Sequence, residues 1–117
     1  MKKVLIIEDD GDTLEMLGYI ASQADVEVVL QSDVIPVTTI QQIKPDLIIL
    51  DHWIGTKRGG DLCLEIKQTQ VTKHIPVILL SALNEIGQIA IESRADGCLT
   101  KPFDMDEIIE VIECYLG

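Results

Sequence analysis

Short apolar runs that end in polar residues are the sequence feature that most constrains the fold. Four of them, at 4–7, 47–50, 77–80 and 98–100, lead directly into acidic, hydroxyl or basic residues, and a fifth run covers 26–30. The segments between the runs carry apolar residues at helical spacing. Strands that alternate with helices indicate βαβ units and a parallel sheet. The pattern predicts an α/β fold around a single sheet, with 47–50 buried on both faces because it is four consecutive aliphatics.

Apolar residues at intervals of three and four predict a helix after each strand. The expected helices cover 12–24, a short stretch that begins near Pro36 and stops before Lys44-Pro45, 60–69, 85–94 and 104–116. Asp104 followed by Glu107 predicts a capping box at the start of the last helix. Strict alternation of five strands and five helices, without linker or repeat, predicts one domain over 1–117.

Charge and hydropathy exclude several classes of protein. The net charge of −11, from 20 acidic and 9 basic residues, argues against direct DNA binding. No apolar segment approaches the roughly 18 residues of a membrane span, and the first run is too short for a signal peptide. We therefore expect a soluble cytoplasmic protein without membrane contact. The three cysteines have no metal-site spacing and are expected to be small buried hydrophobes: Cys63, Cys98 and Cys114.

Five polar side chains are expected to meet at one edge of the sheet. The carboxyl ends of parallel strands share an edge, which predicts a crevice containing Glu8, Asp9, Asp51, Ser81 and Lys101. Carboxylate oxygens suit Mg²⁺, or Mn²⁺, and one or two of them plus a phosphate suffice. Packed together without a cation, the acids would repel one another and raise at least one pKa.

The same crevice has the groups needed for phosphoryl transfer. An Asp51 oxygen can attack a phosphoryl group to give an aspartyl phosphate, and a carboxylate needs no general base to activate it. Ser81 can donate a hydrogen bond to one phosphoryl oxygen and Lys101 can pair with another. Transfer of this kind depends mainly on positioning and charge neutralisation.

These motifs, in this order, resemble the receiver domain of two-component response regulators along the whole chain. The matching residues are Glu8-Asp9, Asp51, Gly59, Ser81-Ala82 and Lys101-Pro102-Phe103. The resemblance implies a doubly wound, flavodoxin-like (βα)5 fold with strand order 2-1-3-4-5. It also implies phosphorylation at Asp51, an accessory Glu8, and metal ligands Asp9, Asp51 and the Trp53 backbone carbonyl, with a cis peptide bond before Pro102.

The resemblance further implies partners. A sensor histidine kinase or histidine phosphotransfer protein would donate the phosphoryl group, and an effector would bind the face formed by 85–94, 98–100 and 104–116. Exposed Ile91 and Val111 are candidates for that surface. The chain would be a monomer or a phosphorylation-dependent dimer. Its only catalysis would be its own Mg²⁺-dependent phosphorylation and dephosphorylation, which makes it a signalling receiver rather than an enzyme.

Three alternative functions fit the sequence less well than this interpretation. A phosphorylation-independent module of the same fold would not need the intact set of site residues. A Mg²⁺-dependent phosphohydrolase typically has a second Asp two residues after the first, where this chain has Trp53. A dinucleotide-binding domain would need a G-x-G-x-x-G motif after a strand, and none occurs.

Several polar residues near the motifs have simpler explanations. Asp10 is expected to face solvent or to cap the first helix. His52 directly follows Asp51, so alternation along an extended backbone should turn it away from that side chain, and neither His52 nor His74 is expected to be catalytic. The segment 57–60 resembles a phosphate loop but lacks the Gly-Lys-Ser/Thr ending, and it is interpreted as the mobile loop beside Asp51.

The chain also departs from the family pattern. Ile54-Gly55 replaces a common Met-Pro, which predicts a less rigid loop, and Arg58 stands where Asp is common. Arg94 replaces the glycine that usually ends the fourth helix in the left-handed conformation, so that helix is expected to end differently.

Two further departures concern switching and the lifetime of the phosphorylated state. Cys98 occupies the place of an aromatic ring that relays activation, so either it is a packing residue and signalling uses loop and helix movement, or switching is lost. Trp53 and Leu83, two residues beyond Asp51 and Ser81, cannot orient a water molecule. They predict slow self-dephosphorylation.

Overall fold

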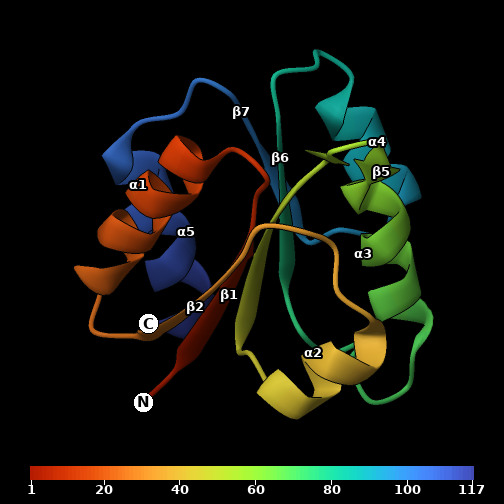
Figure 1. Ribbon diagram of the computed structural model, residues 1–117, viewed down its shortest axis with the longest axis horizontal. Helices are drawn as coiled ribbons and strands as arrows, with labels where there is room; N and C mark the ends of the chain where they lie inside the picture. Colours follow the sequence, from red (N-terminus) through yellow and green to blue (C-terminus); the bar gives the residue numbers. More distant parts are fainter.

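A five-stranded parallel sheet forms the centre of the molecule (Figure 1). The computed structural model describes residues 1–117. The sheet has the order β2-β1-β3-β6-β7. Its strands are β1 (Lys3–Ile7), β2 (Glu27–Gln31), β3 (Leu47–Asp51), β6 (Val77–Ser81) and β7 (Gly97–Thr100). Counted along the chain, these five strands have the predicted order 2-1-3-4-5, so the flavodoxin-like fold is confirmed.

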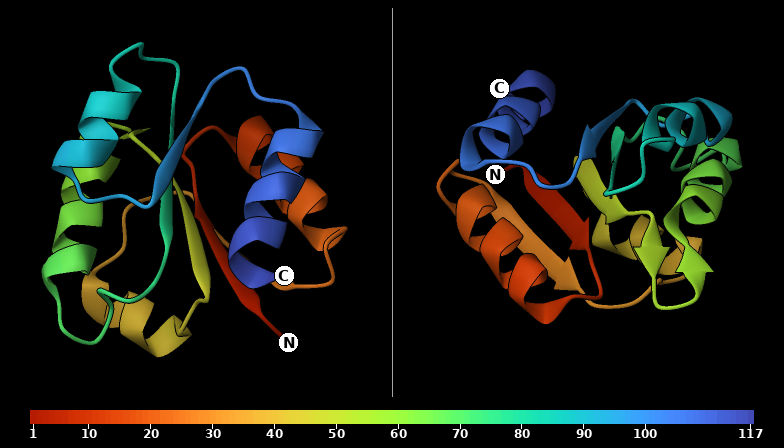
Figure 2. Two further views of the ribbon diagram at one scale, coloured as in Figure 1. Left: turned by 180° about the vertical axis from the view of Figure 1, so that it is seen from behind. Right: turned by 90° about the horizontal axis from the view of Figure 1, so that it is seen from above.

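Helices cover both faces of the sheet. They are α1 (Gly11–Ser22), α2 (Val37–Ile43), α3 (Gly59–Gln68), α4 (Ile86–Glu92) and α5 (Met105–Leu116). Figure 2 shows α1 and α5 together on one face, and α2, α3 and α4 on the other. The five expected helices are confirmed, with ends that differ by a few residues. None of the helices combines the length and the apolarity required to cross a membrane.

The core has two parts, one on each side of the sheet. Side chains of β1 and β3 alternate between them, because successive residues of a strand point to opposite faces. Val4, Ile6, Leu47 and Ile49 pack toward α1 and α5, whereas Leu5, Ile7, Ile48 and Leu50 pack toward α2, α3 and α4. Every residue of β3 is buried, as its sequence predicted.

The cysteines do not share one environment. Cys63 is buried, but Cys98 is half-buried and Cys114 is exposed, so the expectation of three buried cysteines was wrong for Cys114. Cys114 lies on the solvent side of α5, where its neighbour Ile112 takes the core position. Cys98 packs against the core on the α2–α4 side, which agrees with the packing interpretation of this residue.

Both predicted helix caps are present. The Asp10 carboxylate accepts hydrogen bonds from the Thr13 N–H (3.0 Å) and the Thr13 hydroxyl (2.6 Å), so Asp10 caps α1. At the start of α5, the Asp104 carboxylate accepts from the Glu107 N–H at 2.9 Å, and the Glu107 carboxylate accepts from the Asp104 N–H at 3.2 Å. This reciprocal pair is the expected capping box.

A small hairpin interrupts the alternation of strands and helices. β4 (Trp53–Ile54) and β5 (Lys57–Arg58) pair antiparallel between β3 and α3. Strict alternation was therefore wrong for this segment. Gly55 at the hairpin tip has φ of 62°, a left-handed conformation that glycine adopts without steric cost. Ile54 is buried in the core, so the segment expected to be less rigid is anchored at one of its residues.

Helix α4 ends on a left-handed arginine. Arg94 has φ of 61°, its N–H donates to the Ile91 carbonyl, and the Ala95 N–H donates to the Ala90 carbonyl. These two bonds make a Schellman motif. The expectation of a different helix end was wrong, because the hydrogen bonds hold the backbone in the conformation that glycine usually provides.

Replacing Arg94 with Gly should therefore stabilise the protein. A non-glycine residue in the left-handed region costs roughly 1 kcal/mol, and glycine removes that cost at this position. We expect Arg94→Gly to raise the free energy of unfolding by about 0.5–1 kcal/mol in urea titrations. Arg94→Asn is the matched control and should give a smaller gain, since asparagine tolerates the left-handed conformation only in part. A decrease in stability for Arg94→Gly would contradict this account.

The two candidate surface aliphatics differ in exposure. Ile91 on α4 is 72% exposed, as expected. Val111 on α5 is half-buried and packs against the core beneath α1 and α5, so its expected exposure was wrong. The stripe that α5 turns toward the sheet is wide enough to include Val111 beside Ile108 and Ile112.

Candidate functional site

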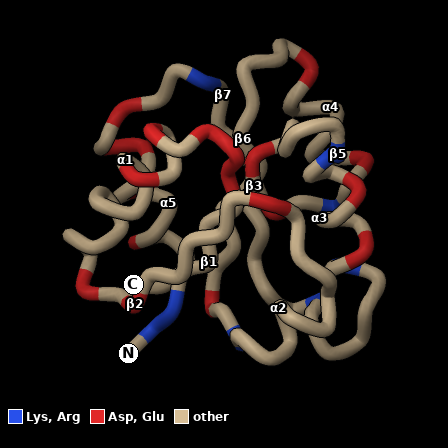
Figure 3. Tube along the Cα trace, viewed as in Figure 1, with Lys and Arg blue, Asp and Glu red and all other residues tan.

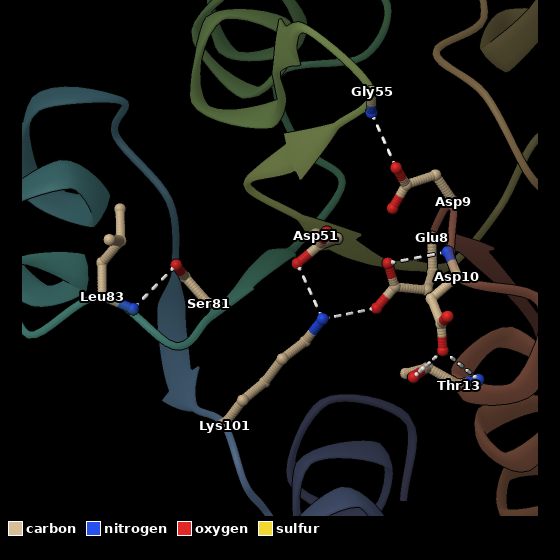
Figure 4. A network of polar contacts seen from close by, with 9 residues as sticks. All are labelled: Glu8, Asp9, Asp10, Thr13, Asp51, Gly55, Ser81, Leu83 and Lys101. Carbon is tan, nitrogen blue, oxygen red and sulfur yellow. Dashed lines mark hydrogen bonds and ion pairs between the residues drawn. The ribbon is translucent and has the colours of Figure 1, made fainter.

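The carboxyl ends of four sheet strands bring five polar side chains to one edge (Figure 4). Glu8 and Asp9 follow β1, Asp51 ends β3, Ser81 ends β6 and Lys101 follows β7. The parallel register aligns these ends: Ile7 pairs with Leu50, Asp51 with Leu80, and Ser81 with Thr100. The predicted convergence of the strand-end motifs is therefore what the register produces.

Three carboxylates form a tight acidic cluster at this edge. One oxygen from each of Glu8, Asp9 and Asp51 lies within 4.8 Å of the others. Glu8 is 1% exposed and Asp51 is 6% exposed, whereas Asp9 faces solvent. Figure 3 shows these acidic segments gathered at the ends of β1 and β3. Carboxylates this close, two of them buried, repel one another unless a cation lies between them.

Lys101 is the one basic side chain that contacts the cluster. Its Nζ lies 2.6 Å from Glu8 Oε1 and 3.1 Å from Asp51 Oδ1. The Lys101–Pro102 peptide bond is cis, as the resemblance implied. Burial lowers the pKa of Lys101, but hydrogen bonds and charge attraction to Glu8 and Asp51 together raise it above its ordinary value, so the ammonium stays charged. One ammonium is thus shared between two carboxylates.

Because the ammonium is shared, it compensates the negative charge of the Glu8 carboxylate only in part. Burial raises the pKa of Glu8 from 4.5 to about 7, and the Asp51 carboxylate adds to the increase, against the lowering effect of Lys101. One cluster pKa, that of Glu8, is therefore raised as expected, although burial contributes more to the increase than repulsion by Asp51. A raised carboxyl pKa near a second acid indicates a site that favours a bound cation.

Ser81 has a hydroxyl free to donate. Its Oγ accepts a hydrogen bond from the Leu83 N–H at 3.0 Å, which fixes the side chain at the end of β6. That bond uses a lone pair, so the hydroxyl proton is not engaged by it. Ser81 is buried and comes from the strand next to Asp51.

The hairpin makes a contact with Asp9 that the sequence does not predict. The Gly55 N–H donates to Asp9 Oδ2 at 2.8 Å, across 46 residues of sequence. The hairpin itself was not expected, so no sequence signal placed this backbone donor near the cluster. The resemblance also assigned the Trp53 backbone carbonyl to the site, and Trp53 begins β4, two residues after Asp51.

His52 points away from the acidic cluster, as predicted. Its Nδ1 accepts a hydrogen bond from the Gly60 N–H at 3.1 Å, and its side chain is buried against the start of α3. Burial lowers the pKa of His52, and Arg58 lowers it further. The ring is a neutral acceptor that joins the end of β3 to α3. His74 is exposed between α3 and β6, far along the chain from the cluster motifs.

The chain is similar to known proteins along most of its length. The family model of the response regulator receiver domain matches residues 4–113. The chain is 34% identical, over 99% of its length, to the DNA-binding dual master transcriptional regulator RpaA of Synechocystis sp.. It is 28% identical, over 98% of its length, to the phosphate regulon transcriptional regulatory protein PhoB of Escherichia coli.

These curated relatives are longer proteins. The chain covers 49% of RpaA and 52% of PhoB, so it spans about half the length of the curated relatives it matches. Among solved structures, the chemotaxis response regulator CheY4 of Vibrio cholerae matches with a TM-score of 0.88 at 24% identity, covering 99% of both chains. At that identity the similarity concerns the fold.

Proposed function

The chain belongs to the response regulator receiver domain family, a family of signalling domains, and on this premise we propose that it takes a phosphoryl group from a phosphohistidine donor onto Asp51. The observation that carries the proposal is the shared ion pair of Lys101 with Glu8 and Asp51 at the carboxyl edge of the sheet. Ser81 on the neighbouring strand supplies the hydroxyl that a phosphoryl oxygen would need.

Asp51 is the nucleophile in this proposal. One of its carboxylate oxygens forms the new bond to phosphorus while the bond from phosphorus to the donor's histidine nitrogen breaks, and the imidazole leaves with that electron pair. The Ser81 hydroxyl donates to one phosphoryl oxygen. Lys101 exchanges its contact with Asp51 for another phosphoryl oxygen and can keep its bond to Glu8.

The acidic cluster would hold the divalent cation that such transfer requires. Glu8, Asp9, Asp51 and the Trp53 backbone carbonyl are the proposed ligands for Mg²⁺ or Mn²⁺. The fit is supported by three convergent carboxylate oxygens and by the raised pKa of Glu8. A bound cation neutralises charge on the carboxylates and the phosphoryl group.

Phosphorylation would then change which partner the domain binds. We propose a sensor histidine kinase or a histidine phosphotransfer protein as donor, and an effector at the face of α4, β7 and α5, where Ile91 is exposed. Moving an inactive–active equilibrium from 1:99 to 99:1 takes about 5.5 kcal/mol of differential binding free energy. Charge-assisted hydrogen bonds from Ser81 and Lys101 to a phosphoryl group could supply it. We propose no DNA contact for these residues, although two relatives are named as transcriptional regulators.

Incubation with acetyl phosphate and Mg²⁺ tests the proposal. We expect intact-mass spectrometry to detect one added phosphoryl group in the wild type, and none in Asp51→Asn or after chelation of the cation. Asp10→Asn is the matched control, because asparagine also caps helices and Asp10 is not in the site. Uptake that persists in Asp51→Asn, or no uptake by the wild type, would exclude phosphorylation at Asp51.

Self-dephosphorylation should be slow, and Trp53→Asn should accelerate it. Trp53 is 45% exposed beside Asp51 but has only an indole N–H, which cannot accept a hydrogen bond from an attacking water. An amide oxygen adds about one hydrogen bond, roughly 1 kcal/mol, which corresponds to about a fivefold faster release of phosphate. Trp53→Leu is the apolar control, and its release of phosphate should be as slow as that of the wild type. Equal rates in all three proteins would contradict this role for position 53.

A further inference from the structure

Asp9 is the exposed member of the acidic cluster, and the hairpin holds it. Its carboxylate accepts the Gly55 N–H at 2.8 Å (Figure 4), and no other residue of the chain donates to it or forms an ion pair with it. Glu8 and Asp51 differ in this respect, because both are buried and both contact Lys101. Without the Gly55 bond, the Asp9 side chain would be free to rotate in solvent.

The backbone conformation at the hairpin tip favours glycine, or a residue that tolerates the left-handed conformation, at the position that donates this hydrogen bond. Gly55 has φ of 62°, and a Cβ at this position would meet nothing within 4 Å, so the restriction comes from the backbone alone. Proline has no N–H and fixes φ near −65°. Asparagine tolerates the left-handed conformation and keeps the donor.

The rest of the hairpin keeps the tip in place. Ile54 is buried in the core, and Ile54 pairs with Lys57 across the two strands. Lys57 Nζ also lies 3.4 Å from Asp33 Oδ1 in the loop after β2. The position of the Gly55 N–H is therefore set by packing and pairing on both sides of the tip, before any cation binds.

We propose that the Gly55 N–H positions Asp9 for the divalent cation, so that the hairpin and the cation site act as one unit. The inference rests on the proposed function. A carboxylate has about four acceptor positions, so one hydrogen bond to Oδ2 leaves room for a cation ligand bond. Holding the side chain beforehand removes the cost of ordering it upon binding. Gly55 is a positioning residue that acts through Asp9.

Mg²⁺ binding has a spectroscopic reporter in this protein. Trp53, the only tryptophan, lies in β4 two residues from Gly55. Because its backbone carbonyl is a proposed cation ligand, Mg²⁺ should change Trp53 fluorescence in the unphosphorylated protein, and the midpoint of that change gives the affinity. Titrations read by Trp53 fluorescence and by calorimetry then give the Mg²⁺ affinity without any phosphorylation assay.

The test compares Gly55→Pro with Gly55→Asn. Loss of an outer hydrogen-bond partner of a metal ligand typically costs 10–100-fold in affinity, so Gly55→Pro should bind Mg²⁺ about tenfold more weakly. Gly55→Asn should stay within about twofold of the wild type. In an Asp9→Asn background, Gly55→Pro should add no further loss, because the two residues act through one contact.

Two further measurements test this role of Gly55 if Gly55→Pro folds poorly. Gly55→Ala keeps the N–H in a strained conformation and should lose affinity to an intermediate degree. Exchange of the Gly55 amide proton, followed by NMR, should be slow in the wild type and fast in Asp9→Ala. An unchanged Mg²⁺ affinity in both Gly55→Pro and Gly55→Ala, or fast exchange in the wild type, overturns the inference. No Mg²⁺ binding by the wild type overturns the proposed function instead.

Discussion

Gly59→Ala is expected to lower the free energy of unfolding by about 3 kcal/mol or more, and to disturb Asp51 directly. A Cβ on Gly59 would overlap the Asp51 carbonyl oxygen and would lie 3.1 Å from His52 Cα. Both contacts are backbone atoms, which cannot rotate away as a side chain can. The end of β3 and the start of α3 would have to separate, and the Gly59 N–H would lose its bond to the His52 carbonyl.

Urea titration measures this effect, and Gly87→Ala is the matched control. Gly87 lies within α4 and a Cβ there meets nothing within 4 Å. Alanine is favoured over glycine in a helix by up to about 1 kcal/mol, so Gly87→Ala should stabilise the protein. If Gly59→Ala has the same free energy of unfolding as the wild type, the end of β3 and the start of α3 can separate without destabilising the fold. If Gly59→Ala folds at low temperature, its phosphoryl uptake should still be impaired, because Asp51 would have moved.

The strands and their polar ends could be predicted because the signals are local. Runs such as 47–50 mark a buried strand, and parallel strands must end on a common edge, so Glu8, Asp51 and Lys101 could be expected together. The strand order came from the family resemblance rather than from periodicity. The caps at Asp10 and Asp104 were predictable because each needs only a partner three residues away.

The missed features depend on contacts between distant segments. The β4–β5 hairpin has strands of two residues, too short for any alternation to show in the sequence. The bond from Gly55 to Asp9 is made by a backbone group, which no residue type reveals. Arg94 was misjudged because two hydrogen bonds outweigh the preference for glycine at that position. Propensity is a weak guide where tertiary contacts decide the conformation.

The metal-free protein should lose stability as the pH rises from about 5 to 8, and Mg²⁺ should reverse that loss. The ordinary pKa of Glu8 is 4.5, and burial raises it to about 7 in the folded protein. Because the folded-state pKa is raised, the folded protein keeps a proton that the unfolded chain releases. The stabilising contribution is complete below pH 4.5 and is lost as the pH passes through about 7. The full difference corresponds to about 3 kcal/mol.

Glu8→Gln isolates this contribution. Glutamine cannot ionise, so the pH-dependent loss should disappear in urea titrations of the metal-free variant. The lowered pKa of His52 acts in the opposite direction, since a buried neutral histidine stabilises the fold as the pH rises. That contribution remains in Glu8→Gln, and the difference between the two proteins therefore reports Glu8.

Added Mg²⁺ completes the test, because a cation at Glu8 and Asp9 requires the ionised carboxylate. Its stabilising effect should grow with pH in the wild type and should be weak at every pH in Glu8→Gln. Parallel pH profiles for the two proteins without cation would show that Glu8 is ionised in the fold. One ammonium would then face two ionised carboxylates, and the pKa of Glu8 would no longer support the proposed cation site.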